Sequence, residues 1–301
     1  MSRVAFLVFA YKNPQVLKSQ IMALSSQECA FFIHIDQKSS IEQFSCIRGE
    51  NVFFSKQRIT VYWAEFSGVD AILVLIRQAL ARPERYDHFV LLSGSEYPLR
   101  SGKYIHTFLD ANPDQDFISM VKMPAPGKPI SRINTLRYTS DKPVRRFASK
   151  ALAKLGLSRR DHKKYLQGLE PYSGITWWTL SRKSCEYILD FMEHNPYVEN
   201  YFRNTFAPEE SFFHTILGNS PLQSKVRGGL LYEDWPLASA HPRMITAKHI
   251  ALFEAQEKFY IEDVYGRREA MFARKFSDDN LDLLERIDVM IKRKEKCAQH
   301  V

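Results

Sequence analysis

Two short segments, far apart in the chain, hold side chains that could act together in group transfer. Residues 272–276 (FARKF) place two cations between apolar residues, and residues 207–210 (APEE) place two carboxylates side by side. Fixed cations can neutralise a departing anion, and a carboxylate can accept a proton from an attacking hydroxyl. These are the two needs of an enzyme that moves a sugar from a nucleotide diphosphate onto a hydroxyl.

The carboxylates are Glu209 and Glu210. Pro208 before them suits the first position of a helix, and acids in a first helical turn complement the helix dipole, so a structural role alone can explain both. The functional interpretation is that one of them is a general base, because a glutamate is ionised at neutral pH. A helix N-terminus lowers a carboxyl pKa, and burial near an acceptor would oppose that effect.

The candidate cations are Arg243, Arg274 and Lys275. A leaving nucleotide diphosphate needs either a divalent metal or fixed cations to stabilise its charge. Arginine supplies a bidentate fork and lysine a point charge. The alternative is that all three are ordinary surface cations among the 42 Lys and Arg residues of the chain.

A metal site is not predicted. Asp114-Gln115-Asp116 has the letters of an Asp-x-Asp motif, but it precedes an apolar run and is expected to be an acid pair in a loop. Residues 93–98 (SGSEYP) occupy the position where a metal motif would follow a strand. His34 and Asp36 lie on one side of a strand, a weak metal pair, and a structural role is expected for His34. A metal-independent mechanism without a cofactor is favoured.

The elements that must position these groups alternate between strand and helix. Buried strands are predicted at residues 3–10, 30–35, 59–63 and 88–92, with helices at 14–26 and 69–81. This alternation predicts an α/β fold with a parallel, doubly wound sheet. Ligands bind at the carboxyl ends of such strands, where Asp36 and Glu96 fall. Ala10, which ends the first strand, joins the predicted donor site.

The second half of the chain predicts strands at 175–180 and 228–235 and helices at 182–194 and 282–294. We expect one domain over residues 1–301, with a nucleotide-binding half at 1–125 and an acceptor-side and catalytic half at 126–301. The four cysteines have no zinc-ligand spacing, and a reducing compartment is expected. No apolar run is long enough for a signal peptide or a bilayer span, so a cytoplasmic protein is expected.

The formal charge is +8, which suits phosphate-bearing substrates, nucleic acid or an anionic membrane surface. Between Lys142 and Lys164 there are nine Lys or Arg residues and one acid. This segment either contacts anionic lipid at the inner membrane or is a solvated loop. A non-catalytic polyanion- or nucleic-acid-binding protein is the rival interpretation. It lacks any known binding motif, so no nucleic-acid partner is expected.

Several motifs together resemble the core-2/I-branching β-1,6-N-acetylglucosaminyltransferase family, which includes peptide O-xylosyltransferases and plant glucuronosyltransferases. They occur in the order of that family over nearly the whole chain. They are HIDQKS at 34–39, VYWAEFS at 61–67, LLSGSEYPL at 91–99, SGITWW at 173–178, PEE at 208–210, DWP at 234–236, HPR at 241–243 and FARKF at 272–276.

This resemblance implies a GT-A fold, with a Rossmann-like, mostly parallel sheet flanked by helices, and an inverting, metal-independent transfer from a UDP-sugar. It implies Glu210 as the base, although Glu209 stands where the family has Asp and leaves the choice open. The implied donor and sugar contacts are Asp36, Arg243 and Lys275 for the nucleotide, and Glu96, Trp235 and Trp177 near the sugars.

The sugar would be N-acetylglucosamine, xylose or glucuronic acid. The membrane anchor and cysteine framework of the animal enzymes are absent, so the chain is similar to a bacterial cytoplasmic member. Such an enzyme would build surface polysaccharide or lipooligosaccharide on a glycan or lipid-linked acceptor. A degenerate relative that binds a nucleotide sugar without turnover fits the same motifs.

Overall fold

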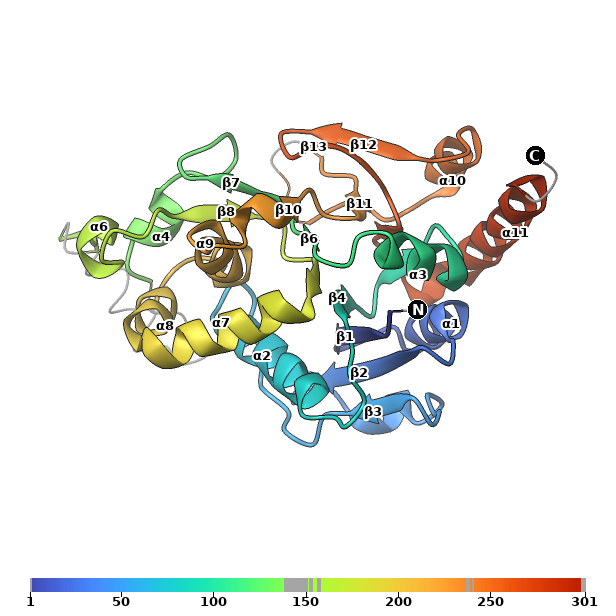
Figure 1. The fold of residues 1–301 in the computed structure, drawn as a ribbon, viewed down its shortest axis with the longest axis horizontal. Helices are drawn as coiled ribbons and strands as arrows, with labels where there is room; N and C mark the ends of the chain where they lie inside the picture. The colour runs from blue at the N-terminus through green and yellow to red at the C-terminus, as the bar shows by residue number, and fades with distance from the viewer. Residues whose placement is uncertain are drawn as a thin grey trace.

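The computed structural model of the chain describes residues 2–137, 151, 154–155, 158–236, 239 and 241–298. Its centre is a seven-stranded sheet of order β10-β6-β9-β4-β1-β2-β3 (Figure 1). Only β9 runs antiparallel to its neighbours in this sheet. The strands are β1 (Val4–Ala10), β2 (Cys29–Ile35), β3 (Val52–Phe54), β4 (His88–Ser93), β6 (Asp116–Phe117), β9 (Thr179–Ser181) and β10 (Val226–Arg227). The predicted mostly parallel α/β sheet is confirmed.

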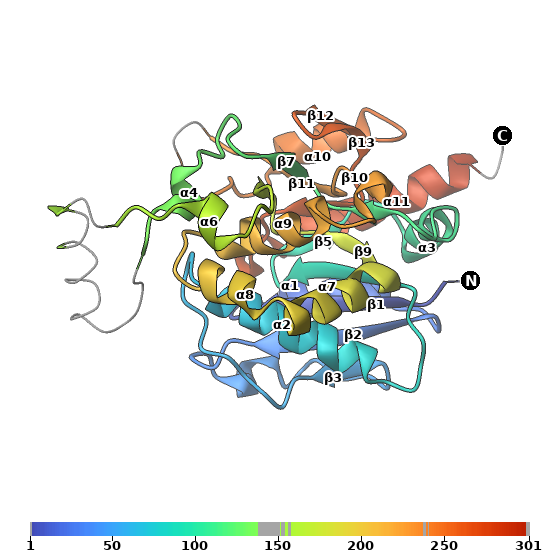
Figure 2. The same cartoon turned by 60° about the vertical axis from the view of Figure 1, so that its left-hand side comes forward.

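Helices cover both faces of the sheet because its central strands are apolar on both sides. Along β1, Phe6 and Val8 face one core while Ala5 and Leu7 face the other, as the two-residue period of a strand requires. The first core includes α1 (Pro14–Leu24) and α3 (Gly102–Asp110). The second includes α2 (Ser67–Leu80), α7 (Arg182–His194), α8 (Pro196–Phe202) and α9 (Phe212–Gly218). Figure 2 shows α2 and α7 beside each other over the strands.

A smaller layer carries the predicted site residues Glu96 and Arg274, with Lys275 directly after its last strand. Its three-stranded sheet has the order β11-β14-β5, and its core is completed by α10 and α11. This layer joins the first half of the chain to the last, because β5 pairs with β14. The bounds are β5 (Glu96–Pro98), β11 (Leu231–Glu233), β14 (Phe272–Arg274), α10 (Ala247–Glu254) and α11 (Leu281–Ala298).

Two antiparallel pairs complete the sheets, β7 with β8 and the hairpin β12–β13. They are formed by β7 (Met120–Lys122), β8 (Tyr172–Gly174), β12 (Tyr260–Asp263) and β13 (Gly266–Glu269). The remaining short elements are α4 (Ser131–Asn134), α6 (His162–Tyr165), η1 (Ile41–Phe44), η2 (Pro208–Glu210), η3 (Gln223–Lys225) and η4 (Asp278–Asn280).

Three strand predictions need correction. Residues 59–63 form a loop, because Ile59 N donates to His34 Nε2 (2.8 Å) and Val61 N faces Asp36 instead of pairing with a strand. The third strand is β3. The strand expected at 175–180 is mostly the connection between β8 and β9, with only residues 179–180 in β9, and the one at 228–235 is limited to β11. The helix predicted at 182–194 is confirmed as α7.

Most of the basic segment between Lys142 and Lys164 lies outside the described residues. Within the described part of the chain, no helix is long and apolar enough to cross a bilayer. All four cysteines are free.

Candidate functional site

The predicted donor residues Ala10 and Asp36 meet at the carboxyl ends of β1 and β2. The backbone N–H of Asp36 donates to the Ala10 carbonyl (2.9 Å), and the Asp36 side chain is nearly buried. Its Oδ1 accepts from the Lys38 N–H (2.9 Å), while Lys38 Nζ lies 3.5 Å from Oδ2. Parallel strands bring their carboxyl ends to one edge, so the sequence could predict this meeting.

A loop of residues 58–66 links this edge to the carboxylate segment. The Val61 N–H lies 3.5 Å from Asp36 Oδ1, and the Ala64 carbonyl accepts from the Ala207 N–H (3.1 Å). The Trp63 ring contacts Phe206 edge-on at 5.7 Å and His241 at 6.3 Å between ring centroids. This loop, part of which was predicted as a strand, therefore contacts the segments that hold Asp36, the carboxylate pair and His241.

Glu210 is a carboxylate held by two cations. Its Oε2 lies 2.5 Å from both Lys128 Nζ and Arg132 Nη2, and its side chain is 26% exposed. Its backbone carbonyl accepts from Ser173 Oγ (2.8 Å), which fixes the short helix η2 against β8. Oε1 has no hydrogen-bond partner among the described residues, so this oxygen can accept a proton. The sequence pattern around Glu210 does not indicate either cation.

Glu209 has a different environment. The residue is partly exposed as a whole, but its Oε2 atom is buried without a hydrogen-bond partner in the described chain. Burial raises the pKa of this carboxyl to about 8, and the neighbouring Glu210 charge acts in the same direction. A carboxyl with this pKa is mostly protonated at neutral pH and is therefore a poor proton acceptor.

Arg274 organises a second group at the small sheet. Its Nε lies 3.1 Å from Glu96 Oε1 and 3.5 Å from Glu233 Oε1, and its guanidinium lies 4.5 Å above the Trp177 ring. Trp235 Nε1 donates to Glu233 Oε2 (3.1 Å). Two predicted sugar-site residues, Glu96 and Trp177, thus contact one guanidinium, and Trp235 joins them through Glu233. Arg274 is paired with two carboxylates, which makes it an unsuitable partner for a leaving diphosphate.

Glu233 was not predicted as a site residue. Burial raises its pKa, Arg274 opposes that shift, and the charges of Glu96 and Glu210 add to it. Glu233 therefore lies within electrostatic reach of the base candidate. The sequence motifs do not indicate Glu233, because it directly precedes the DWP segment without being part of it.

The predicted diphosphate contacts Lys275 and Arg243 lie on neighbouring segments, since Ile245 N donates to the Lys275 carbonyl (2.9 Å). Partial burial lowers the pKa of Lys275, and the charges of Lys12 and Arg274 lower it further. Lys12, just after β1, is a further cation that the sequence reasoning missed. Arg243 is 59% exposed and pairs with Asp234 (3.2 Å).

The Asp-x-Asp letters have a structural explanation. Asp116 begins β6 and is buried, and its carboxylate accepts from Ser181 N (2.7 Å) and from Ser184 Oγ at the start of α7. The expectation of a loop pair is thus wrong for Asp116, which anchors a helix. His34 has the expected structural role, and burial lowers its pKa to about 4. No group of three potential metal ligands occurs among the described residues.

The geometry can be compared with known proteins. A solved structure of a 4-diphosphocytidyl-2C-methyl-D-erythritol synthase from Anaerococcus prevotii covers 63% of this chain and 76% of its own. It is 13% identical with a TM-score of 0.29, too low to support any argument. Xylosyltransferase 2 of Rattus norvegicus is 26% identical over 305 residues, covering 95% of this chain and 33% of the relative. Xylosyltransferase 1 of Rattus norvegicus is 25% identical over 245 residues, covering 77% of this chain and 28% of the relative.

The chain spans about a third of the length of these curated relatives. The family model described as Core-2/I-Branching enzyme matches residues 4–257, which include the β1–β2 edge, the loop of residues 58–66, the carboxylate pair and Glu233. By this match, the chain belongs to the Core-2/I-branching enzyme family.

Proposed function

We propose that the protein is a glycosyltransferase that moves a sugar from a UDP-sugar to a hydroxyl of a glycan acceptor. The observation that carries this proposal is the contrast between two adjacent glutamates. Glu210 is partly exposed and ion-paired through one oxygen only, while burial raises the pKa of Glu209 to about 8. One suitable base, in a segment bonded to the loop that contacts Asp36, is the arrangement that transfer to a hydroxyl needs. The family and the xylosyltransferase relatives support the same class of reaction.

The proposed reaction is a single displacement that inverts the anomeric carbon. Glu210 Oε1 accepts the proton of the acceptor hydroxyl while the hydroxyl oxygen forms its bond to that carbon. The bond from the carbon to the UDP oxygen breaks, and UDP leaves with the electron pair. Lys128 and Arg132 hold the Glu210 carboxylate through Oε2, which keeps its other oxygen directed to the acceptor.

Leaving-group charge is assigned to Lys275 and Arg243, with Lys12 as a further cation near Lys275. Arg243 would have to exchange its exposed Asp234 contact for the diphosphate, a modest cost for a solvent-exposed pair. Ala10 and Asp36 are assigned to uridine. With three cations near the diphosphate, we propose that no divalent metal is required.

The Arg274 cluster is assigned to the transferred and accepting sugars, with Trp235 and Trp177 as the aromatic contacts. We propose a donor of the N-acetylglucosamine, xylose or glucuronic acid class. The acceptor would be a surface polysaccharide or lipooligosaccharide precursor made in the bacterial cytoplasm. The charge of the segment between Lys142 and Lys164 supports a peripheral contact with anionic lipid.

Thermal shift with UDP and a panel of UDP-sugars tests the donor site, first in EDTA and then with manganese. A ligand at 100 times its Kd stabilises the folded state by about 2.7 kcal/mol. We expect a clear rise in Tm with UDP in EDTA, and the largest rise should identify the donor sugar. If no uridine nucleotide raises Tm in either condition, the transferase proposal fails and the polyanion-binding alternative returns.

Transfer is then measured with that donor in wild type and Glu210→Gln. The variant should keep UDP binding and lose a factor of about 10² to 10⁴ in turnover, the usual contribution of a general base. Glu186→Gln is the matched control, since Glu186 also forms a close arginine pair (2.6 Å to Arg182 Nε) but lies on α7. Near-normal turnover of Glu210→Gln would exclude Glu210 as the base.

A further inference from the structure

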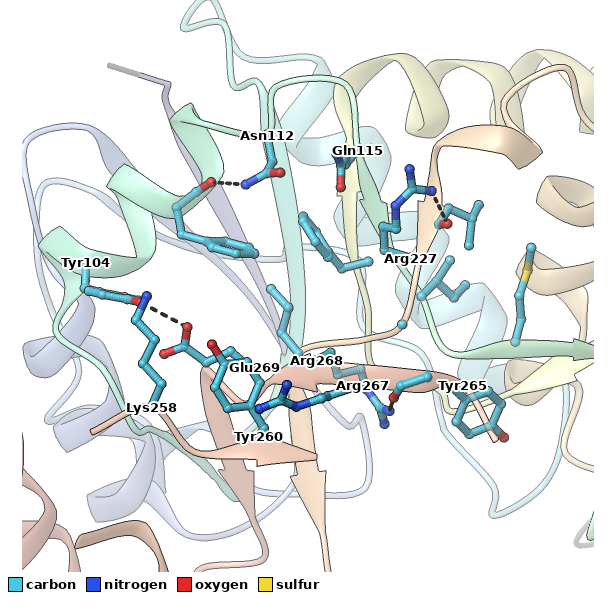
Figure 3. A pocket seen from close by; sticks show the side chains of 18 residues that line it. Tyr104, Asn112, Gln115, Arg227, Lys258, Tyr260, Tyr265, Arg267, Arg268 and Glu269 are labelled. Atoms are coloured by element: carbon cyan, nitrogen blue, oxygen red, sulfur yellow. Dashed lines mark hydrogen bonds between the residues drawn. The ribbon is translucent and has the colours of Figure 1, made fainter. Parts of the chain in front are cut away.

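A cavity of about 670 Å³ lies outside the cluster of predicted site residues. Its walls come from α3, from β6 and β10 at the end of the large sheet, and from the β12–β13 hairpin (Figure 3). The volume is within the range of about 300–1,000 Å³ that is usual for ligand sites. No sequence motif indicates this cavity, because its walls are contributed by segments more than a hundred residues apart.

Two charged residues of the wall are neutralised by the protein itself. Arg268 is nearly buried and forms a two-point pair with Asp263 (2.7 and 2.8 Å). Glu269 is bound by Arg100 (2.6 Å) and by the Tyr104 hydroxyl (2.9 Å). These paired groups make a rigid, preorganised wall.

Three further cations line the cavity, and each has no carboxylate partner in the described part of the chain. Arg227 donates only to backbone carbonyls, those of Ser224 (3.0 Å) and Val226 (2.8 Å). Arg267 lies above the Tyr260 ring (4.3 Å), and Lys258 lies beside the Tyr104 ring (5.7 Å). The cavity therefore has an excess of positive charge, which favours an anionic ligand.

Aromatic rings accompany these cations. Tyr104 and Tyr260 contribute to the lining, and Tyr265 lies at the end of the cavity far from Lys258 (Figure 3). A sugar ring presents apolar C–H faces that pack on aromatic rings, and a carboxylate or phosphate on that sugar would contact the cations. A free inorganic anion would use the cations but not the rings.

The cavity adjoins the proposed base. Met120 of β7 lines it, and β7 pairs with β8, where the Gly174 carbonyl accepts from Lys128 Nζ (2.6 Å). That same ammonium binds Glu210. Burial raises the pKa of Tyr265 to about 12, and the Glu210 charge adds to this shift.

We propose that this cavity binds a negatively charged sugar of the acceptor, with its anionic group held by Lys258 and Arg267 and its ring packed on tyrosine. A uronic acid and a sugar phosphate share this chemistry. The assignment to the acceptor rests on the proposed transferase function, whereas binding of an anionic sugar does not. Occupancy of the cavity would then make the enzyme selective for acidic glycans.

Binding is measured by calorimetric titration at low ionic strength with glucuronic acid, glucose 6-phosphate, glucose and inorganic phosphate. The test variant is Lys258→Gln with Arg267→Gln, two cations on the cavity wall. The matched control is Arg286→Gln with Lys292→Gln, which removes the same charge from the exposed side of α11. UDP is titrated into all three proteins.

We expect glucuronic acid, glucose 6-phosphate or both to bind wild type and the control, and the better one identifies the anionic group. The test variant should lose about tenfold or more in affinity, because each charged hydrogen bond is worth more than a neutral one. Equal binding of glucose would refute the role of charge, and equal binding of phosphate alone would refute the role of the sugar ring. Absence of any binding, or equal loss in the control, would refute the site.

The UDP titrations separate this inference from the proposed function. Normal UDP binding without anionic-sugar binding would remove only the cavity assignment. Anionic-sugar binding without UDP binding would leave the cavity as a saccharide site and remove the transferase proposal.

Discussion

Replacing Glu209 by glutamine should stabilise the protein above acidic pH. The pKa of this carboxyl is about 8 in the folded state against an ordinary value of 4.5. Between those values the folded state binds more protons than the unfolded state, so the free energy of unfolding falls as pH rises through this window. At pH 7 the raised pKa lowers the free energy of unfolding by about 3 kcal/mol. The loss is about 1.4 kcal/mol for each pH unit over the roughly 2.5 units between the unfolded-state pKa and pH 7.

Glutamine is neutral at every pH and avoids this cost. Its amide N–H groups would enter a site where Oε2 of Glu209 already lacks a partner, which subtracts about 1–3 kcal/mol at all pH values. The pH dependence is therefore the informative quantity. We expect the free energy of unfolding of Glu209→Gln relative to wild type to rise by about 2–3 kcal/mol between pH 5 and pH 7.5.

The assay is denaturant unfolding of wild type and Glu209→Gln at several pH values between 4.5 and 8. Glu186→Gln is the control, because it also replaces a glutamate by glutamine but at an exposed carboxylate that pairs with Arg182 on α7. If the stability curves of wild type and Glu209→Gln run parallel, Glu209 is ionised in the folded protein. The argument that only Glu210 can be the base would then be refuted.

The remaining predictions concern the transfer reaction. Glu209→Gln should keep turnover within about tenfold of wild type, because it replaces a protonated carboxyl; a loss of about 10³ would show Glu209 to be the base. Lys275→Ala should lower kcat/KM by about 10² or more, while Lys248→Ala on α10 should not. Asp36→Asn should raise the Kd for UDP about tenfold in titrations and leave kcat little changed, and unaltered UDP affinity would remove Asp36 from the donor site. Exhaustive dialysis against EDTA should leave transfer unchanged, whereas loss restored by manganese would show that a metal is needed.

The sequence predicts the part of the site that follows from sheet topology. Apolar strands alternating with helices require a parallel sheet, and a parallel sheet brings Ala10 and Asp36 to one edge. Helix α7 was also predictable, since its apolar period and the Ser181 cap are local signals. Residues 59–63 misled the strand prediction because their apolar residues are spaced as in a strand, although they form a loop bonded to His34 and Asp36, and periodicity does not separate the two.

The cation partners of Glu210 could not be predicted. Lys128 and Arg132 lie some eighty residues before it, in a stretch with no motif, and long-range contacts such as the β7–β8 pairing and the bond from Phe206 N–H to the Arg132 carbonyl bring them to η2. For Arg274 the sequence indicated a role that the structure does not support. Its place in the FARKF segment suggested an anion contact, but the register of β14 against β5 and β11 sets it opposite Glu96 and Glu233. The register between strands that are distant in the chain decides which charged side chains meet. A single sequence does not reveal that register.

The contact between the loop of residues 58–66 and the carboxylate segment has a strained backbone on both sides. Ala64 has φ 59° and Ala207 has φ 47°, both in the left-handed region that costs a non-glycine residue about 1–2 kcal/mol. These two alanines are buried and joined by the Ala207 N–H to Ala64 carbonyl bond. Strain of this kind persists where the surrounding structure fixes it, often at functional sites. Here it fixes the Glu209–Glu210 pair against the loop that contacts Asp36, so the relative position of these side chains is set by the backbone itself.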